Sequence, residues 1–386
     1  ITHHKMTLKS PENSLLGSTF NPKRLTLARE RRGLTKKKLA ELVGLSVRAI
    51  TGYELGEYLP ESMDMISNAL RFPVSFFMSD NDLFQPKPET VSFRSLSTLT
   101  APKRDAAIGS ASIACMLDDW IEQHFGRPKL NVPDFRGMLP EEAANAVRVT
   151  WGLGEKPIKH MVQLLESKGI RVYSLAEMAN EADALSFWRE QTPFVLLNIQ
   201  KSPERSRFDA AHELGHLVLH RHGGPIGHGE NQDVEKVADA FASAFLMPRS
   251  GLLASVPPLP TLGNIVQLKT HWLVSAMAMV YRLKDVGAIS DWHSRILFQD
   301  LSIKGFRRSE PDGMVQRETS PTLSKIFEVL RNDHITKSQV ADELDLLEEE
   351  LEQHVFGLVI QGIHGSAVPH NSKPRVSGKP SLRVVK

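Results

Sequence analysis

The sequence predicts a mainly helical protein with a small β-sheet, an α+β fold class. Three observations support this: short amphipathic helical patterns near the N-terminus, three short apolar runs with strand character in the middle, and helical periodicity through most of the remainder. The chain has 386 residues, and roughly 100 to 200 residues per domain predicts two or three domains. We therefore expect an all-helical N-terminal domain, a central α+β domain and a helical C-terminal region.

The composition is that of a globular protein in water, with 41% hydrophobic and 24% charged residues. No apolar run approaches the roughly 20 residues needed to span a bilayer, and the polar start ITHHKM lacks the apolar core of a signal peptide. These features predict a cytoplasmic protein with no membrane segment. The single cysteine, Cys115, excludes an intramolecular disulfide and a cysteine-based zinc site, so histidine, aspartate or glutamate must hold any metal.

Residues 20–77 have the pattern of short helices separated by glycine and by serine or threonine. Thr35 is expected to cap one helix, Gly44 to supply a left-handed turn and Ser46 to cap the next helix. A helix, a short turn containing glycine and a second helix are typical of a helix-turn-helix. Residues 21–58 carry nine Lys or Arg against four Glu, which predicts a face that binds phosphate.

The central part begins after a linker marked by three prolines in DLFQPKPETVSFRSLSTLTAPKRD. Apolar spacing and the end signals predict helices at 105–125 and 157–170, strands at 170–175, 184–188 and 193–199, and helices at 204–221 and 233–248.

The helix expected at 204–221 contains HELGH, which is a candidate metal-binding motif. His212 and His216 are four residues apart on one helical face, so both imidazoles can reach one cation. Glu213 lies between them and can take a proton from water on that cation. The alternative is an ordinary amphipathic helix, because a chain with 15 histidines can contain such a match by chance.

The next helix offers a third ligand. Glu235 and Asp239 share one face of it, and the glycine-rich stretch before it is long enough to turn that helix back. Glu235 would complete the metal site, and Asp239 would bond the far nitrogen of a ligand histidine. Two alternatives remain: a solvated acidic helix face, or a metal-storing loop that uses the nearby His220, His222 and His228.

The run RFDAAHELGHLVLH, followed by E-x-x-A-D-x-F-A-x-x-F-L-M-P, resembles the ImmA/IrrE family of zinc-dependent peptidases. The resemblance covers about 157 to 250 and implies that His212, His216 and Glu235 bind Zn²⁺ and that Glu213 is the general base. The family often has Asn where Asp239 stands. In such enzymes an edge strand, here 184–188 or 193–199, would pair with an extended peptide.

A further group must stabilise the oxyanion of the reaction, and the sequence does not locate it. His271 and Tyr281 are chemically suitable, although each fits equally a packed position in an expected helix, HWLVSAMAMVYRL.

The stretch GLTKKKLAELVGLSVRAITGYELG resembles the XRE, or lambda-repressor-like, helix-turn-helix family. That resemblance implies binding of double-stranded operator DNA by a homodimer. It places Lys36, Lys37 and Lys38 near phosphates, and Ser46, Arg48, Ala49 and Thr51 near base edges. The family commonly has Gln where Lys36 stands. The alternative is a helical module that binds protein.

TKSQVADELDLLEEEL, residues 336–351, has the same layout as residues 35–50, including a capping box formed by Thr336 and Gln339. Residues 342–352 hold seven acidic residues and no basic ones, which DNA phosphates would repel. We therefore expect this second unit to bind protein, either a partner subunit or the N-terminal domain.

Together these patterns divide the chain as follows: a flexible N-terminus at 1–19, a helix-turn-helix domain at 20–80, a linker at 81–104, a zinc metallopeptidase-like domain at 105–255, a helical extension at 256–310, a C-terminal helical unit at 311–365 and a disordered basic tail at 366–386. The leading hypothesis is a DNA-binding transcriptional regulator whose peptidase cleaves a partner repressor, or itself within the linker, in phage, mobile-element, defence or stress control. The rival is a non-enzymatic repressor or antitoxin-like regulator, in which the zinc-site domain is a sensor or docking module. A third possibility is repression controlled by metal.

Overall fold

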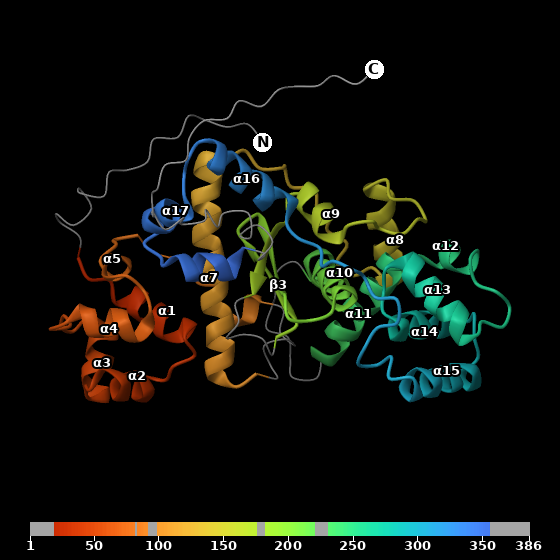
Figure 1. Cartoon of the computed structure of the whole chain (residues 1–386), viewed down its shortest axis with the longest axis horizontal. Helices are drawn as coiled ribbons and strands as arrows, with labels where there is room; N and C mark the ends of the chain where they lie inside the picture. The colour runs from red at the N-terminus through yellow and green to blue at the C-terminus, as the bar shows by residue number, and fades with distance from the viewer. Residues whose placement is uncertain (1–18, 82, 92–98, 176–181, 221–230, 356–386) are drawn as a thin grey trace, which may run out of the picture.

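The structure is a computed structural model that describes residues 19–81, 83–91, 99–175, 182–220 and 231–355 (Figure 1). The expected disordered tail, most of the expected flexible N-terminus, and His222 and His228 lie outside these residues. Within the described ranges, no helix combines the length and the apolarity that crossing a membrane requires. The architecture is mainly helical around one small sheet, so the predicted fold class is confirmed.

The N-terminal helices form the predicted helix-turn-helix. They are α1 (Pro22–Arg31), α2 (Lys36–Val43), α3 (Val47–Leu55), α4 (Met63–Leu70) and α5 (Val74–Phe77). Thr35 and Ser46 accept hydrogen bonds from Lys38 N and Ala49 N, so both predicted caps are confirmed. Gly44 has φ +67°, the left-handed conformation that lets α3 start at an angle to α2.

A long helix, α7 (Ala101–His124), separates these helices from the sheet in Figure 1. It begins four residues before the predicted start at 105, because Pro102 stands in the first turn, where its missing N–H costs nothing. Helix α1 packs closely on it at Gly109, where a Cβ atom would lie 3.0 Å from Arg31 Cα. The expected linker also contains a short 3-10 helix, η2 (Pro88–Thr90).

The sheet contains the three predicted strands: β1 (Arg171–Leu175), β2 (Ala184–Arg189) and β3 (Thr192–Asn198). Their order is β1-β3-β2, with β1 parallel to β3 and β2 antiparallel to it. Strand β2 therefore lies at an edge. Its outer side carries one isolated antiparallel bridge, between Phe187 and Val91 of the expected linker.

Two helices carry HELGH and the acidic pair: α10 (Pro203–Leu219), which packs on β2 and β3, and α11 (Asn231–Leu246), which packs on α10. They pack against each other at Gly215, where a Cβ atom would lie 3.1 Å from the Phe241 ring. The C-terminal end of α11 is bound by two buried arginines. Arg148 donates to Phe245 O at 2.6 Å, and Arg282 donates to Met247 O at 2.9 Å.

Arg148 belongs to α8 (Pro140–Thr150), an element that the sequence analysis did not predict. The helix expected at 157–170 is shorter than predicted. It is α9 (Met161–Ser167), because the His160 side chain accepts from Gln163 N and caps the helix at that point.

The remaining helices are α12 (Arg249–Leu253), α13 (Leu262–Trp272), α14 (Ala276–Asp285), α15 (Asp291–Ile303), α16 (Pro321–Asn332), α17 (Lys337–Glu343) and α18 (Glu348–His354). The prediction of one helix through HWLVSAMAMVYRL is wrong. Leu273 adopts φ +55° and ends α13, and Ser275 caps α14 by accepting from Ala278 N.

The C-terminal helices fold back onto the N-terminal half. Thr336 and Gln339 form the predicted capping box at the start of α17. Glu350 of α18 binds both Arg31 and Arg32 at the end of α1. This acidic unit was expected to bind either a partner subunit or the N-terminal domain. The structure shows that it contacts the N-terminal domain.

Candidate metal centre

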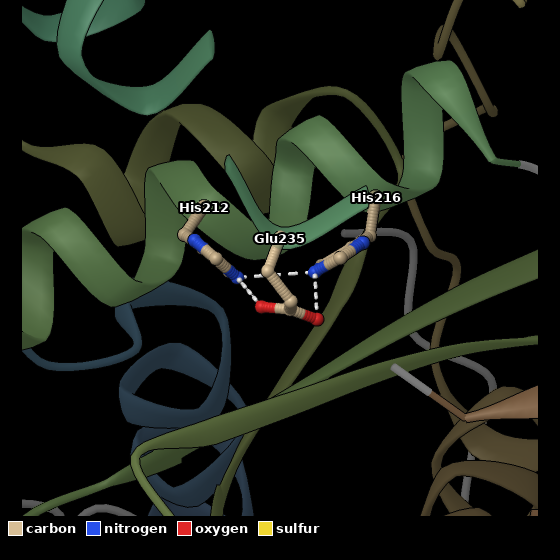
Figure 2. Close-up of side chains that lie close together, drawn as sticks. All are labelled: His212, His216 and Glu235. Atoms are coloured by element: carbon tan, nitrogen blue, oxygen red, sulfur yellow. Dashed lines mark hydrogen bonds and ion pairs between the residues drawn. The ribbon is translucent and has the colours of Figure 1, made fainter. Parts of the chain in front are cut away.

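Three side chains from α10 and α11 converge above the sheet (Figure 2). The Nε2 atoms of His212 and His216 lie 3.0 Å apart, because residues four apart on a helix face the same way. Glu235 reaches them from α11, with Oε2 3.2 Å from His212 Nε2 and Oε1 3.5 Å from His216 Nε2. Two imidazoles and one carboxylate thus point at one another from two tightly packed helices.

The donor set fits a zinc ion. The ligand atoms of a tetrahedral site with bonds of about 2.0 Å are roughly 3.3 Å apart, close to the separations seen here. Two imidazoles and one carboxylate leave a fourth position for water or substrate, which is typical of catalytic zinc sites. These three residues are the ligands predicted from the sequence, and the structure brings them together.

Asp239 supports the cluster one turn further along α11. Its Oδ1 lies 2.8 Å from His212 Nδ1, the ring nitrogen that faces away from Glu235. Such a carboxylate fixes the orientation of a ligand histidine and increases its basicity. The arrangement is the one expected from the Glu235 and Asp239 spacing.

The charges of the cluster perturb one another strongly. Burial opposes protonation of His212, but its bonds to Asp239 and Glu235 together raise its pKa to about 10. Burial likewise would raise the pKa of Glu235, but the hydrogen bonds of the two histidines hold it well below its usual range. In the metal-free protein, His212 is therefore protonated at physiological pH.

Glu213 lies beside these residues and is buried, with 3% of its surface exposed. Its Oε2 accepts a hydrogen bond from the Ser186 hydroxyl of β2 at 2.5 Å. The edge strand therefore holds the carboxylate that follows the first histidine. Ser186 was not among the predicted site residues, although a serine in the apolar run ALSFW was a visible signal.

An open cleft of about 610 Å³ runs from this centre to α14. Glu213, Asp183 and Ala184 line it, as does Tyr281 of α14. His271 is exposed and does not belong to this lining. Of the two candidate oxyanion donors, the structure therefore places Tyr281 in the cleft.

His220 continues the face of the two histidines, with its ring centroid 5.6 Å from that of His216. Burial lowers the pKa of His220 to about 4, with a further contribution from the charge of His216. It is neutral at physiological pH. Among the described residues, the group that could hold a metal ion consists of His212, His216 and Glu235.

The residues expected to contact DNA belong to α2, to α3 and to the N-cap of α3, and these helices lie at the lower left of Figure 1, away from α10 and α11. Lys37, Lys38, Ser46 and Arg48 are exposed, and Ala49 and Thr51 are half-buried. Lys36 forms an ion pair with Glu54 at 3.1 Å. The Thr51 hydroxyl donates to Val47 O, and Ser46 caps α3.

Two segments of the chain match models of known families. Residues 25–76 match the helix-turn-helix family, and residues 165–284 match the IrrE N-terminal-like domain. A search of curated proteins gave no match. The second segment contains the sheet, α10, α11 and all but the last residue of α14. Both resemblances seen in the sequence are thus confirmed, in the same order along the chain.

Proposed function

We propose that the chain is a DNA-binding transcriptional regulator whose second domain is a zinc-dependent peptidase that cleaves a partner repressor or the chain itself. The helix-turn-helix and the IrrE-like domain fit a regulator. One observation favours hydrolysis over a purely structural metal site: Glu213 is buried beside the three ligand residues and held by Ser186. A site kept only for structure has no need of a positioned base.

The residues would act in the following way. A zinc ion bound by His212, His216 and Glu235 would polarise the peptide carbonyl and lower the pKa of its water toward about 7. Glu213 would accept the proton of the attacking water and later deliver it to the leaving amine. Ser186 would keep the Glu213 carboxylate turned into the cleft.

Tyr281 would donate a hydrogen bond to the oxyanion. It lines the same cleft as Glu213, and 53% of its surface is exposed, so the phenol is accessible to a substrate. Its ring packs on Phe298, with centroids 4.6 Å apart, which limits its freedom.

The charge of the cleft supports a basic protein substrate. Its lining holds more acidic than basic side chains; the acids are Asp183, Glu204, Asp209, Glu213, Glu235, Asp239 and Asp285, and the bases are Arg205 and Lys236. Even with a divalent cation bound, an excess of negative charge would remain. A basic segment of a DNA-binding repressor fits that surface.

The same proposal places the chain in the cytoplasm, as a homodimer on operator DNA. Lys37 and Lys38 would bind phosphates, with Lys36 contributing less because Glu54 already pairs with it. Arg48, with support from Ser46, Ala49 and Thr51, would read base edges.

The test compares the zinc-loaded full-length protein with its Glu213→Gln variant. Each is incubated with the proteins encoded beside its gene, and intact masses are followed by mass spectrometry. We expect the wild type to cut a neighbour or itself, and the variant to bind the same zinc and operator DNA without cutting. Absence of cleavage by the wild type, with an unchanged regulatory response in the variant, would instead support the non-enzymatic regulator.

A control separates the metal-responsive alternative. If regulation is by metal alone, a chelator should change operator affinity equally in the wild type and in Glu213→Gln, and no protein should be cut.

A further inference from the structure

The outer edge of β2 is partly covered by the chain's own linker. We call residues 83–91 the linker segment. Val91 pairs with Phe187 in an antiparallel bridge and is 4% exposed. Phe84 stacks on the same Phe187, with ring centroids 6.2 Å apart, and the Arg189 guanidinium lies 5.3 Å from the Phe84 ring. Two apolar anchors thus hold this segment against β2.

The covered position adjoins the catalytic end of the strand. Ser186, the neighbour of Phe187, holds Glu213, and Ala184 lines the cleft. No residue of the linker segment appears in the cleft lining of the described chain. The segment therefore occupies the sheet edge beside the metal centre and leaves the cleft open.

An extended peptide would add to this edge by main-chain hydrogen bonds, because the other side of β2 is already paired with β3. A peptide that passed from Ala184 to Arg189 would need the position opposite Phe187, where Val91 now lies. We propose that the linker segment is an intramolecular competitor of the peptide substrate. The inference rests on the proposed peptidase function, because it identifies what regulates access to that site.

The competitor is connected to the DNA-binding domain. Gln85 Nε2 donates to Glu30 Oε2 of α1 at 3.2 Å, between the two anchor residues in the sequence. The segment also begins only six residues after the last residue of α5 in the sequence. A shift of the helix-turn-helix against α7 would therefore pull on the segment and alter access to β2.

Because the linker segment is part of the same chain, a few contacts are enough for it to occupy the edge of β2. A segment tethered this closely competes at an effective concentration in the millimolar range. A free peptide must overcome that concentration, whereas loss of one anchor should free the edge.

The test uses a fluorescein-labelled peptide of the linker segment, LFQPKPETV, and zinc-loaded full-length protein. Affinity is measured by fluorescence anisotropy for the wild type, Phe84→Ala, Val91→Lys and Lys87→Ala. Phe84→Ala removes the stacked ring, and Val91→Lys places a charge where burial is nearly complete. Lys87 is exposed on the same segment, so Lys87→Ala is the matched control.

We expect both anchor variants to bind the peptide at least about 10-fold more tightly than the wild type and the control, because the cis competitor has been weakened. A peptide with Lys in place of its final Val should bind none of them. Equal affinity in all four proteins, or no binding, overturns the inference. Cleavage of the intact peptide, checked by mass spectrometry, also overturns it, because the segment would then be a substrate.

Hydrogen exchange supplies a second readout that requires no peptide. Amides of β2 should exchange faster in Phe84→Ala than in Lys87→Ala, and unchanged exchange counts against the inference even if Val91→Lys fails to fold. The outcome is separate from that of the proposed function. If none of the proteins cuts a substrate but their peptide affinities still differ, the peptidase function is wrong and the competition at β2 still holds.

Discussion

Arg31 at the end of α1 donates from Nε to Oε1 of Glu350 on α18 at 2.7 Å, and both side chains are almost wholly buried. Arg32 donates to the other carboxylate oxygen at 2.6 Å. Burial alone would raise the pKa of Glu350, but the charges of Arg31 and Arg32 and the bond from His354 hold it below its usual range. The DNA-binding domain and the C-terminal unit are therefore joined by a buried, charged contact.

Glu350→Ala should destabilise the protein by about 3–5 kcal/mol, because it leaves Arg31 buried without its counter-charge. Urea unfolding of the full-length protein measures the effect. Glu349→Ala, which removes an exposed carboxylate from the same helix, is the control and should change stability by less than about 0.5 kcal/mol. Equal effects of the two substitutions would show that the contact is not stabilising.

Zinc binding at pH 8 should release at least one proton, because His212 is protonated in the metal-free protein and must lose its proton to become a ligand. A zinc-bound water, with its pKa lowered toward about 7, would add to this number. Calorimetric titration in two buffers of different ionisation enthalpy gives the number of protons. His220→Ala should release the same number, since the lowered pKa of His220 leaves it neutral at that pH. Zinc binding with no proton release would contradict the role of His212.

Asp239→Ala should weaken zinc binding by about 10- to 100-fold, since it removes the acceptor that orients His212. Competition with a chromophoric chelator measures the affinity. Ser243→Ala, one turn further along α11 in the same cleft, should leave it unchanged. The hypothesis fails if the two variants bind zinc equally well.

Asp209 should make the metal-free protein less stable as the pH rises. Burial raises its pKa from 3.8 to about 7, so between these values the folded protein holds a proton that the unfolded chain has lost. The contribution of Asp209 to the free energy of unfolding is therefore greatest below about pH 4. It falls by about 1.4 kcal/mol per pH unit from there up to pH 7. Asp209→Asn should make the urea midpoint of unfolding less dependent on pH between pH 4.5 and 7.5. Asp64→Asn, an exposed control, should keep the wild-type slope.

Lys37→Ala should weaken the binding of operator and non-operator DNA equally. It should also reduce the slope of log affinity against log salt concentration by about 1. Arg48→Ala should instead cost about 1–3 kcal/mol on the operator and relax the choice of one base pair. Fluorescence anisotropy at several salt concentrations distinguishes them. Identical changes in both variants would mean that α3 does not read bases.

Local signals predicted much of the fold. The caps at Thr35 and Ser46, the three strands, and the shared helical faces of His212 with His216 and of Glu235 with Asp239 depend on neighbours within a few residues or on helical spacing. The break at Leu273 was missed because the apolar periodicity continues through a residue in the left-handed conformation.

Contacts between distant segments were not predictable in detail. The sequence marked Ser186 as polar within an apolar strand, but only the packing of β2 against α10 shows that it binds Glu213. The prolines around Lys87 predicted a linker, but they did not show that Phe84 and Val91 dock on the edge strand β2. Such pairings depend on tertiary geometry, which single-sequence patterns do not encode.

The two arginines that bind the end of α11 have a consequence for how related chains can diverge. Arg148 and Arg282 fix that helix from its C-terminal end, and Gly215 fixes its distance from α10. The position of Glu235 therefore does not depend on the residues that connect the two helices. Insertions and deletions at 221–230 should accumulate in evolution without loss of the metal site, whereas changes at Arg148 or Arg282 should be rare although neither touches it.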